Sequence, residues 1–361
     1  MIYLDANATE PLRPQARAAV IAAMDDIGNP SSVHAAGRSA RRRLEESREA
    51  IAACFGGRPA DLVFTSGGTE ADALAIHGLG RDRRHIVGAT EHDAVRAAAT
   101  DAIVLPVDAD GVADLAALER LLRDGPALVC LMLANNETGA IQPIAAAAAL
   151  CRAAGALLHV DAVQAAGRVP VDFAGLGANS MALSSHKLGG PPGAGALLLS
   201  PRAAATLSPL IVGGGQERGR RGGTPPLPAI AGFAAAACAA GGAAAVEPLR
   251  DAVEHAATAA GATLVGSRAP RLANTACLAL PGVPAETQVI ALDLAGIQVS
   301  AGAACSSGKV ARSHVLDAMG LGALAGQAIR VSLPWNATAE DVAAFAGAYQ
   351  AMARRLLRRA A

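Results

Sequence analysis

The first half of the chain alternates short apolar runs with longer runs in which apolar residues recur at helical spacing. Short runs rich in Val, Leu and Ile predict buried strands, and a recurrence of about 3.6 residues predicts amphipathic helices. The strands expected on this basis lie at residues 61–66, 85–90, 127–134, 156–162, 180–185 and 195–200. The helices expected between them lie at residues 38–56, 68–80, 114–124 and 144–155. This alternation predicts an α/β fold with a mainly parallel sheet, whose ligand groups lie beyond the carboxyl ends of the strands.

The pattern changes twice in the second half of the chain. Residues 213–228, GGGQERGRRGGTPPLP, contain too much Gly and Pro for a helix or strand. They predict a long loop, and long ordered loops tend to be functional. An Ala-rich helix is expected at 229–242, and after Val246 helices alternate with strands such as 271–281. We therefore expect a large domain at 14–246 and a smaller α/β domain formed by 1–13 and 247–361.

The charge and composition narrow the classes of function. Lys and Arg together number 31, and so do Asp and Glu, so the formal net charge is zero. A balanced charge gives no reason to expect capture of nucleic acid or of an anionic membrane. No apolar stretch reaches the length of a membrane span uninterrupted, and the start MIYLDANATE lacks the features of a signal peptide. We expect a cytoplasmic protein whose partners are small molecules or other proteins.

Six cysteines are scattered along the chain without a CxxC pair, at positions 54, 130, 151, 238, 277 and 305. This spacing argues against a zinc ribbon and against a disulfide framework, and we expect no metal site. Most of these cysteines are expected to pack as small apolar residues. Cys305 differs, because in SAGAACSSGKVARSH its neighbours are Ser, Gly and Ala and not a periodic apolar run. Such neighbours favour a reachable thiol on a loop.

Basic and polar residues follow Cys305. Lys309, Arg312 and His314 either favour the thiolate form of the cysteine or are ordinary solvated charges beside a helix that begins at Ser313. The sequence leaves these two interpretations open.

Two charged residues stand at the ends of expected strands. Asp161 ends the apolar run LLHVDA, and Lys187 lies between an apolar strand and a glycine-rich turn in ALSSHKLGGPPG. A lysine in such a place is usually a solvated surface residue. Together, however, the two residues suit pyridoxal phosphate: the lysine forms a Schiff base with its aldehyde, and the carboxylate keeps its ring nitrogen protonated.

Polar residues end three further strands. The run FTSGGTEAD offers hydroxyls at Ser66 and Thr69 beside a helix N-terminus. This suits a phosphate, and equally an ordinary capped turn. His92, in ATEHDAV, is either structural or a residue that stacks on a cofactor and moves protons. Asn136 and Glu137, in LMLANNETGAI, either form a turn or face the same site.

Taken together, these runs resemble the cysteine desulfurases of the class V aminotransferase superfamily. The resemblance covers nearly the whole chain, through IYLDANAT, GNPSSVHAAGRSARR, FTSGGTEAD, TEHDAV, ANNETGAIQP, HVDAVQAAGRVPVD, SSHKLGGPPGAGAL, GGGQERGRRGGT, GAACSSGKVARSHVLDAMG and IRVSL. It implies the architecture of fold type I pyridoxal-phosphate-dependent transferases, with a large and a small domain in a homodimer.

The resemblance also implies a role for each matching residue. Lys187 is the Schiff-base lysine, Asp161 the pyridinium partner, and Gln164 the donor to the cofactor's phenolic oxygen. His92 stacks on the ring, and Cys305 is the catalytic cysteine, in the group of the family whose cysteine loop is longer and mobile. The phosphate contacts implied are Gly68, Thr69, Ser184, His186 and, from the neighbouring subunit, Thr224. Asn136, which also belongs to the cofactor contacts, and Arg330 orient the substrate carboxylate, a group that suits the fork of arginine.

Three sites depart from the family pattern. Glu10 stands where a hydroxyl residue is common, and Pro192 stands where Lys is common. Pro334–Trp335 follow IRVSL where Gly–Arg is common. None of these changes removes a cofactor contact, but those beside Arg330 bear on the shape of the substrate end.

The implied activity is that of a pyridoxal-phosphate-dependent L-cysteine desulfurase. L-Cysteine becomes L-alanine, and a persulfide is left on Cys305 for an acceptor such as an iron–sulfur scaffold or a tRNA-thiolation protein. Two other interpretations stay open. One keeps the cofactor and changes the reaction, as in a selenocysteine lyase or another class V enzyme. The other is a catalytically silent sulfur carrier or scaffold protein.

Overall fold

The structure is a computed structural model that describes residues 1–241, 243–302 and 312–360. Its strands are β1 (Ile2–Tyr3), β2 (Leu62–Thr65), β3 (Arg84–Gly88), β4 (Ile103–Leu105), β5 (Ala127–Cys130), β6 (Leu157–Asp161), β7 (Ser180–Ser184), β8 (Gly195–Leu199), β9 (Thr263–Leu264), β10 (Thr275–Ala279), β11 (Ile297–Gln298), β12 (Ser300–Ala301) and β13 (Ala328–Ser332). Its α-helices are α1 (Pro14–Met24), α2 (Ala35–Cys54), α3 (Gly68–Leu79), α4 (Asp93–Ala98), α5 (Leu115–Leu121), α6 (Ile144–Ala153), α7 (Phe173–Leu176), α8 (Pro201–Thr206), α9 (Leu227–Ala239), α10 (Glu247–Ala259), α11 (Ala285–Leu294), α12 (His314–Ala318) and α13 (Ala339–Ala360).

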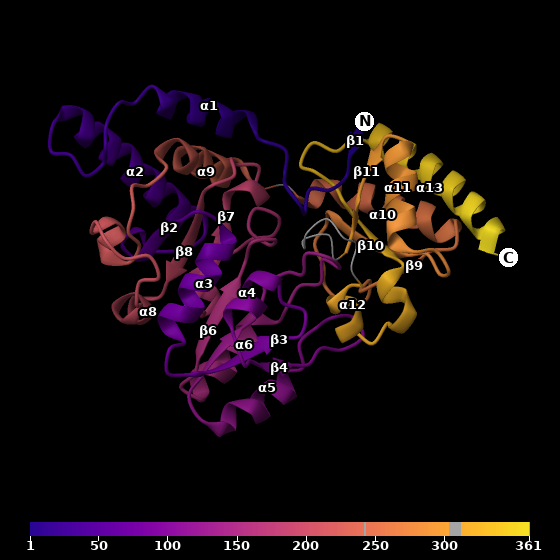
Figure 1. Ribbon diagram of the computed structural model, residues 1–361, viewed down its shortest axis with the longest axis horizontal. Helices are drawn as coiled ribbons and strands as arrows, with labels where there is room; N and C mark the ends of the chain where they lie inside the picture. Colours follow the sequence, from indigo (N-terminus) through magenta and orange to yellow (C-terminus); the bar gives the residue numbers. More distant parts are fainter. Residues whose placement is uncertain (242, 303–311, 361) are drawn as a thin grey trace.

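A seven-stranded sheet in the order β2-β8-β7-β6-β5-β3-β4 forms the centre of the larger body (Figure 1). The neighbours from β7 to β4 are parallel, whereas β8 runs antiparallel to both β7 and β2. Every residue of β5, β6, β7 and β8 is buried, as continuous apolar runs require when helices cover both faces of a sheet. The predicted α/β fold with a mainly parallel sheet is confirmed.

Each face of this sheet has its own layer of helices. On one face Ile51 of α2, Leu118 of α5 and Phe233 of α9 belong to one hydrophobic cluster with strand residues such as Val129. On the other face Leu74 of α3 packs in a cluster with Leu128, the neighbour of Val129 in β5. Successive strand residues point to opposite faces, so the two clusters lie on the two sides of the sheet. Helix α3 packs against β6, β7 and β8 on this second face. Its first turn therefore lies beside the carboxyl ends of β6 and β7.

The smaller body holds an antiparallel sheet in the order β12-β13-β10-β9, packed against α10, α11 and α13 (Figure 1). The N-terminus belongs beside it, because β1 pairs in parallel with β11 and Leu4 is buried in the core of this body. Residues 5–13 then cross to the seven-stranded sheet, where Arg13 N–H donates to Gly189 O at 2.8 Å. The two bodies are therefore joined by a segment from the beginning of the chain.

The glycine-rich run expected to be a long loop contains a short 3-10 turn at Gln216–Gly219, and α9 begins at Leu227, inside the stretch expected to be loop. The loop is anchored by the carboxylate of Glu217. It accepts two hydrogen bonds from Arg48, at 2.7 and 2.8 Å, and one from Phe64 N at 2.9 Å. Among the helices of the described residues, none has the length and apolar character needed to cross a bilayer.

Candidate active site

The carboxyl ends of β5, β6 and β7 and the first turn of α3 surround a cavity of about 220 Å³. Parallel neighbouring strands end at the same edge of a sheet, which brings together residues far apart in the sequence. The residues that line the cavity are Gly68, Thr69, Asp72, His92, Met132, Ala134, Asn136, Asp161, Val163, Gln164, Ser184, His186 and Lys187. They include the lysine, the aspartate and the polar strand ends that the sequence singled out.

Lys187 lies in a short turn, Ser185–Lys187, directly after β7. Its Nζ donates hydrogen bonds to the carbonyl oxygens of Asn7 at 2.6 Å and Ala8 at 2.9 Å. Gln164 Nε2 donates to the same oxygen of Asn7 at 2.9 Å. The N-terminal segment therefore lies against the amine and positions two of the expected cofactor residues.

Asn7 is a residue that sequence reasoning missed. Its side-chain Nδ2 donates to Asn136 O at 3.1 Å and to Thr275 Oγ1 at 3.0 Å, so it joins the cavity wall to the smaller sheet. The polar run DANAT, directly after the buried Leu4, was the available signal. No spacing rule, however, relates that run to a lysine 180 residues away.

Asp161 ends β6, and its Oδ1 accepts the backbone N–H of Val163 at 2.9 Å. Burial raises the pKa of Asp161, whereas the Val163 N–H, His92 and Lys187 lower it, and the net direction is upward. Asp72 and Glu91 are also buried, and burial together with the charge of Asp161 raises the pKa of each. This end of the cavity is therefore rich in carboxyl groups and short of positive charge. A protonated ring nitrogen beside Asp161 would supply that charge.

A hydrogen-bonded chain lies behind Asp161. Asp72 Oδ1 is 3.1 Å from His159 Nε2, and His159 Nδ1 is 2.9 Å from Ser180 Oγ. Burial lowers the pKa of His159 to about 3, so its ring is neutral at physiological pH. Sequence reasoning missed Asp72, although a single acid among the apolar residues on the buried face of α3 was a signal.

The first turn of α3 forms another part of the cavity wall. Thr69 and Ser184 line it, and free backbone N–H groups at a helix N-terminus attract anions. Gly68 has to be small, because an added Cβ would lie 2.7 Å from Val163 Cγ2. The pKa of His186 is lowered to about 4 by burial and by the nearby charges of Lys187 and Arg168, so this ring is also neutral. The donors present suit a phosphate group.

His92 precedes α4 and caps it. Its Nδ1 accepts the backbone N–H of Ala94 at 3.1 Å. A ring nitrogen that accepts a hydrogen bond carries no proton, so the ring proton of His92 lies on Nε2. The ring lines the cavity in this tautomer.

Arg330 reaches the site from β13, in the other sheet. Its NH1 donates to the backbone carbonyl of Asn136 at 3.1 Å, and 1 % of Arg330 is exposed. The Nε of Arg330 is buried without a hydrogen-bond partner among the described residues. Arg330 is not among the residues that line the cavity, and it approaches the cavity through Asn136. The structure thus brings the two expected substrate residues together.

Besides Arg330, two more expected site residues are not among those that line this cavity. Thr224 is exposed on its loop and does not line the cavity in this chain. Cys305 lies outside the described residues, and so does Lys309.

The residues that follow Cys305 have local partners. Arg312 NH2 lies 2.6 Å from Asp317 Oδ1 at the surface, and His314 Nε2 lies 3.0 Å from Glu91 O. Ser313 begins α12 as expected, with its Oγ accepting from Leu316 N at 3.1 Å and donating to Glu137 Oε2 at 2.6 Å. These contacts favour the ordinary interpretation of Arg312 as a surface charge. They also assign Glu137 to the support of this helix.

Residues 2–345 match the sequence profile of the family described as Aminotransferase class-V. The chain belongs to this family. It is 44% identical over 357 residues to a cysteine desulfurase of Cereibacter sphaeroides, across 94% of this chain and 92% of that protein. The X-ray structure of a NifS-like protein from Rickettsia africae matches with a TM-score of 0.90 and 34% identity, over 98% of this chain and 99% of that chain. A structure described as SspA in complex with cysteine matches with a TM-score of 0.83 and 28% identity, over 92% and 99% of the two chains.

Class V aminotransferases are enzymes of fold type I and depend on pyridoxal phosphate. The residues that line the cavity also fit this cofactor chemically, independently of the comparisons. The cavity wall contains a helix N-terminus with hydroxyl groups, the carboxyl group of Asp161, whose pKa is raised by burial, and a lysine amine. At Gly68 the backbone lies so close to Val163 and Ser184, two residue positions of the cavity wall, that a side chain there would displace them.

Proposed function

We propose that this chain is a pyridoxal-phosphate-dependent cysteine desulfurase that converts L-cysteine to L-alanine and leaves a persulfide on Cys305. The observation that carries the proposal is the convergence of Lys187 and Asp161 in one cavity that Arg330 approaches through Asn136. The desulfurase names of several relatives and the cysteine complex of a structural neighbour support the choice of substrate.

The cofactor is held at its two ends. Gly68, Thr69, Ser184 and His186 hold the phosphate with backbone and side-chain donors. Asp161 keeps the ring nitrogen protonated. Once bound, pyridoxal phosphate supplies an aldehyde for amino groups and a ring that accepts the electrons released at the substrate's Cα.

Three further residues act on the substrate. Arg330, supported by the carbonyl of Asn136, binds the carboxylate of L-cysteine. Lys187 Nζ, held close by the carbonyls of Asn7 and Ala8, takes the α-proton. His92 carries its proton on Nε2, so this nitrogen can donate a hydrogen bond or a proton inside the cavity.

The sulfur transfer is balanced by the thiol of Cys305. Its thiolate attacks the substrate sulfur, an S–S bond forms, and the Cβ–S bond of the substrate breaks. The carbon keeps the electron pair and takes up a proton. L-Cysteine and one protein thiol thus become L-alanine and one protein persulfide, with no external oxidant or reductant.

The test is an anaerobic incubation of the cofactor-loaded protein with L-cysteine, in which alanine is quantified and extra sulfur is located by peptide mass spectrometry. We expect alanine and a persulfide on Cys305. Cys305→Ala removes both, whereas Cys54→Ala, at an exposed cysteine of the helical surface, is the matched control. Alanine from L-selenocysteine alone, with no need for Cys305, would instead indicate a selenocysteine lyase. Protein that binds no cofactor would indicate a silent carrier.

The proposal includes an assembly and a location. We place the large domain at 14–246 and the small domain at 1–13 and 247–361, and the separate hydrophobic cores of the two bodies support this division. In a homodimer, the exposed Thr224 would reach the phosphate of the neighbouring subunit. The five described cysteines are free thiols, which supports a cytoplasmic location, and the persulfide acceptor would be an iron–sulfur scaffold or a tRNA-thiolation protein.

A further inference from the structure

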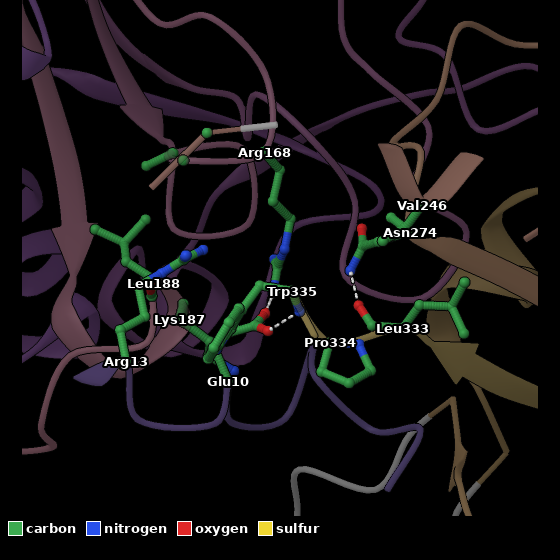
Figure 2. Close-up of a pocket in the computed structure, with 13 residues that line it drawn as sticks. Glu10, Arg13, Arg168, Lys187, Leu188, Val246, Asn274, Leu333, Pro334 and Trp335 are labelled. Atoms are coloured by element: carbon green, nitrogen blue, oxygen red, sulfur yellow. Dashed lines mark hydrogen bonds and ion pairs between the residues drawn. The ribbon is translucent and has the colours of Figure 1, made fainter. Parts of the chain in front are cut away.

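A second cavity, of about 180 Å³, also touches Lys187 (Figure 2). Glu10, Arg13, Arg168 and Trp335 are among the residues that line it. Two of the sites that depart from the family pattern, Glu10 and Pro334–Trp335, therefore lie together here, although 325 positions separate Glu10 from Trp335. Both sites therefore lie beside Lys187, where they can act together on its position and charge.

Glu10 joins the two bodies of the protein with its two carboxylate oxygens, as Figure 2 shows. Oε1 accepts the backbone N–H of Trp335 at 2.7 Å, and Oε2 accepts from Arg168 NH2 at 3.2 Å. Both side chains of the ion pair are 5 % exposed. A buried arginine without its carboxylate partner is costly, so Arg168 depends on Glu10 for charge balance.

The side chain of Trp335 makes further contacts with residues 10–13. Its Nε1 donates to Pro11 O at 2.9 Å. The guanidinium of Arg13 lies over the indole ring, 5.1 Å from the centroid, in a cation–π contact. The chain after β13 is thus attached to residues 10–13 at three points.

Arg168 connects Glu10 to Gln164 through hydrogen bonds. Its NH1 donates to Gln164 Oε1 and to Gln164 O, and its NH2 donates to Ala6 O at 3.2 Å. With the amide oxygen held by Arg168, the amide NH₂ group of Gln164 faces the other way and donates to Asn7 O. That carbonyl also accepts from Lys187 Nζ. One connected network therefore runs from Trp335 to Lys187.

We propose that Glu10, Arg168 and Trp335 form a latch whose positioning residue, Glu10, fixes the amide of Gln164 and the amine of Lys187 for catalysis. The inference rests on the proposed function for the roles of Lys187 and Gln164. The latch acts through charge as well as through contacts, because Glu10 and Arg168 are a buried pair beside the lysine. Glu10 and Trp335 form this network in this chain, in place of the residues common at their positions in the family.

The test uses the visible absorbance of the cofactor-loaded protein, which reports the protonation of the Schiff base that Lys187 forms, titrated against pH. Glu10→Gln removes a negative charge near Lys187, so we expect the titration midpoint to fall by about half a pH unit or more. Arg168→Gln removes a positive charge, so the midpoint should rise by a similar amount. The double variant restores the charge balance and should return close to the wild-type midpoint.

A merely structural role would give another result. If the variants only loosen the packing, the titration midpoints of both single variants will shift in the same direction or will not shift. Either outcome overturns the latch. The control is Glu119→Gln, which removes a glutamate from an exposed pair with Arg123 and should leave the midpoint unchanged.

A second readout needs no titration. Trp335 is the single tryptophan of the chain, so intrinsic emission reports on the latch alone. Glu10→Ala should move this emission to longer wavelength, because the backbone of Trp335 loses its anchor and the indole then moves further into water, and Glu119→Gln should not. Unchanged emission in Glu10→Ala would contradict the attachment.

Neither readout depends on turnover of L-cysteine. If the wild-type protein binds the cofactor and forms no alanine, the proposed function fails while both latch tests keep their meaning. If alanine forms and the midpoints do not shift in opposite directions, the latch fails and the proposed function stands.

Discussion

The buried Arg330 forms an ion pair with the half-buried Asp5, with NH2 of the arginine 2.7 Å from Oδ1 of the aspartate. Asp5 accepts a further hydrogen bond from Ser300 Oγ at 2.8 Å, so its carboxylate is fixed on both oxygens. The arginine is therefore held in place and charge-balanced before any substrate arrives. Its Nε has no hydrogen-bond partner among the residues that the structure describes, which leaves a donor for a second carboxylate.

Replacement of Arg330 by Lys should weaken the binding of L-cysteine more than it slows the chemistry. Lysine keeps the charge and loses the planar fork, so one or more charge-assisted hydrogen bonds to the carboxylate disappear. We expect KM to rise by roughly 10- to 100-fold, with kcat changed by about threefold or less. Steady-state rates of alanine formation measure both constants.

The matched control for this variant is Arg312→Lys, in an exposed pair with Asp317. The cofactor absorbance of both variants should equal that of the wild type. An unchanged KM in Arg330→Lys would remove the residue from the substrate site.

Asp161→Asn should abolish most of the turnover while leaving the cofactor bound. The phosphate end of the cavity lies at α3 and is untouched, but a neutral amide no longer stabilises a protonated ring nitrogen. We expect kcat to fall by about 100-fold or more, the loss typical of removing one preorganised electrostatic contact. Cofactor content and alanine formation are measured on the same samples, and a variant with near wild-type kcat would contradict the assignment.

The pairing of His159 with Asp72 predicts how stability depends on pH. The pKa of His159 is lowered by burial from 6.5 to about 3. Between these pH values the unfolded chain binds a proton that the folded chain does not, so the free energy of unfolding falls as the pH falls. This histidine alone contributes a slope of about 1.4 kcal/mol per pH unit in that window.

His159→Asn keeps a polar side chain near Asp72 and removes the titration. Its unfolding free energy between pH 4 and 6, measured with denaturant, should therefore decline less steeply than that of the wild type. Glu91, whose pKa is raised by burial, acts with the opposite sign in both proteins and cancels in the comparison, and the asparagine amide keeps a hydrogen-bonding group beside Asp72. His77→Asn, at an exposed position of α3, should retain the wild-type slope, and equal slopes in all three proteins would refute a neutral buried His159.

The strand ends could be predicted from the sequence because the rule behind them is local. Apolar runs mark the strands, parallel strands end at one edge, and Asp161 and Lys187 follow directly from where two runs stop. Boundaries were less exact. The expected strand at 127–134 ends at Cys130, and the buried backbone after it carries Met132 and Ala134 into the cavity wall. Helix α2 begins at Ala35, three residues before the expected start, because His34 caps it in place of a usual capping residue.

The N-terminal part of the site could not be predicted in this way. Asn7 lies beneath Lys187 because β1 pairs with β11, almost 300 residues later, and no local pattern encodes that pairing. Glu10 and its partner Trp335 were noticeable in the sequence only because each departs from the family pattern. Their contact depends on how the two bodies pack together, and this packing cannot be read from the residues around Glu10 or from those around Trp335.

Gly68→Ala should separate cofactor affinity from stability. The backbone of Gly68 is helical, and the preference of alanine for a helix offsets part of the cost of overpacking, so the free energy of unfolding without cofactor should fall by no more than about 2 kcal/mol. The new Cβ, however, would lie 2.7 Å from Val163 Cγ2 and 3.5 Å from Ser184 Cβ, at the phosphate end of the cavity. Displacing Val163 by this overpacking should raise the Kd for pyridoxal phosphate by about tenfold or more. Gly347→Ala, at an exposed glycine of α13 with open space around it, is the control, and equal cofactor affinities in the two variants would show that the close approach at Gly68 does not serve the cofactor.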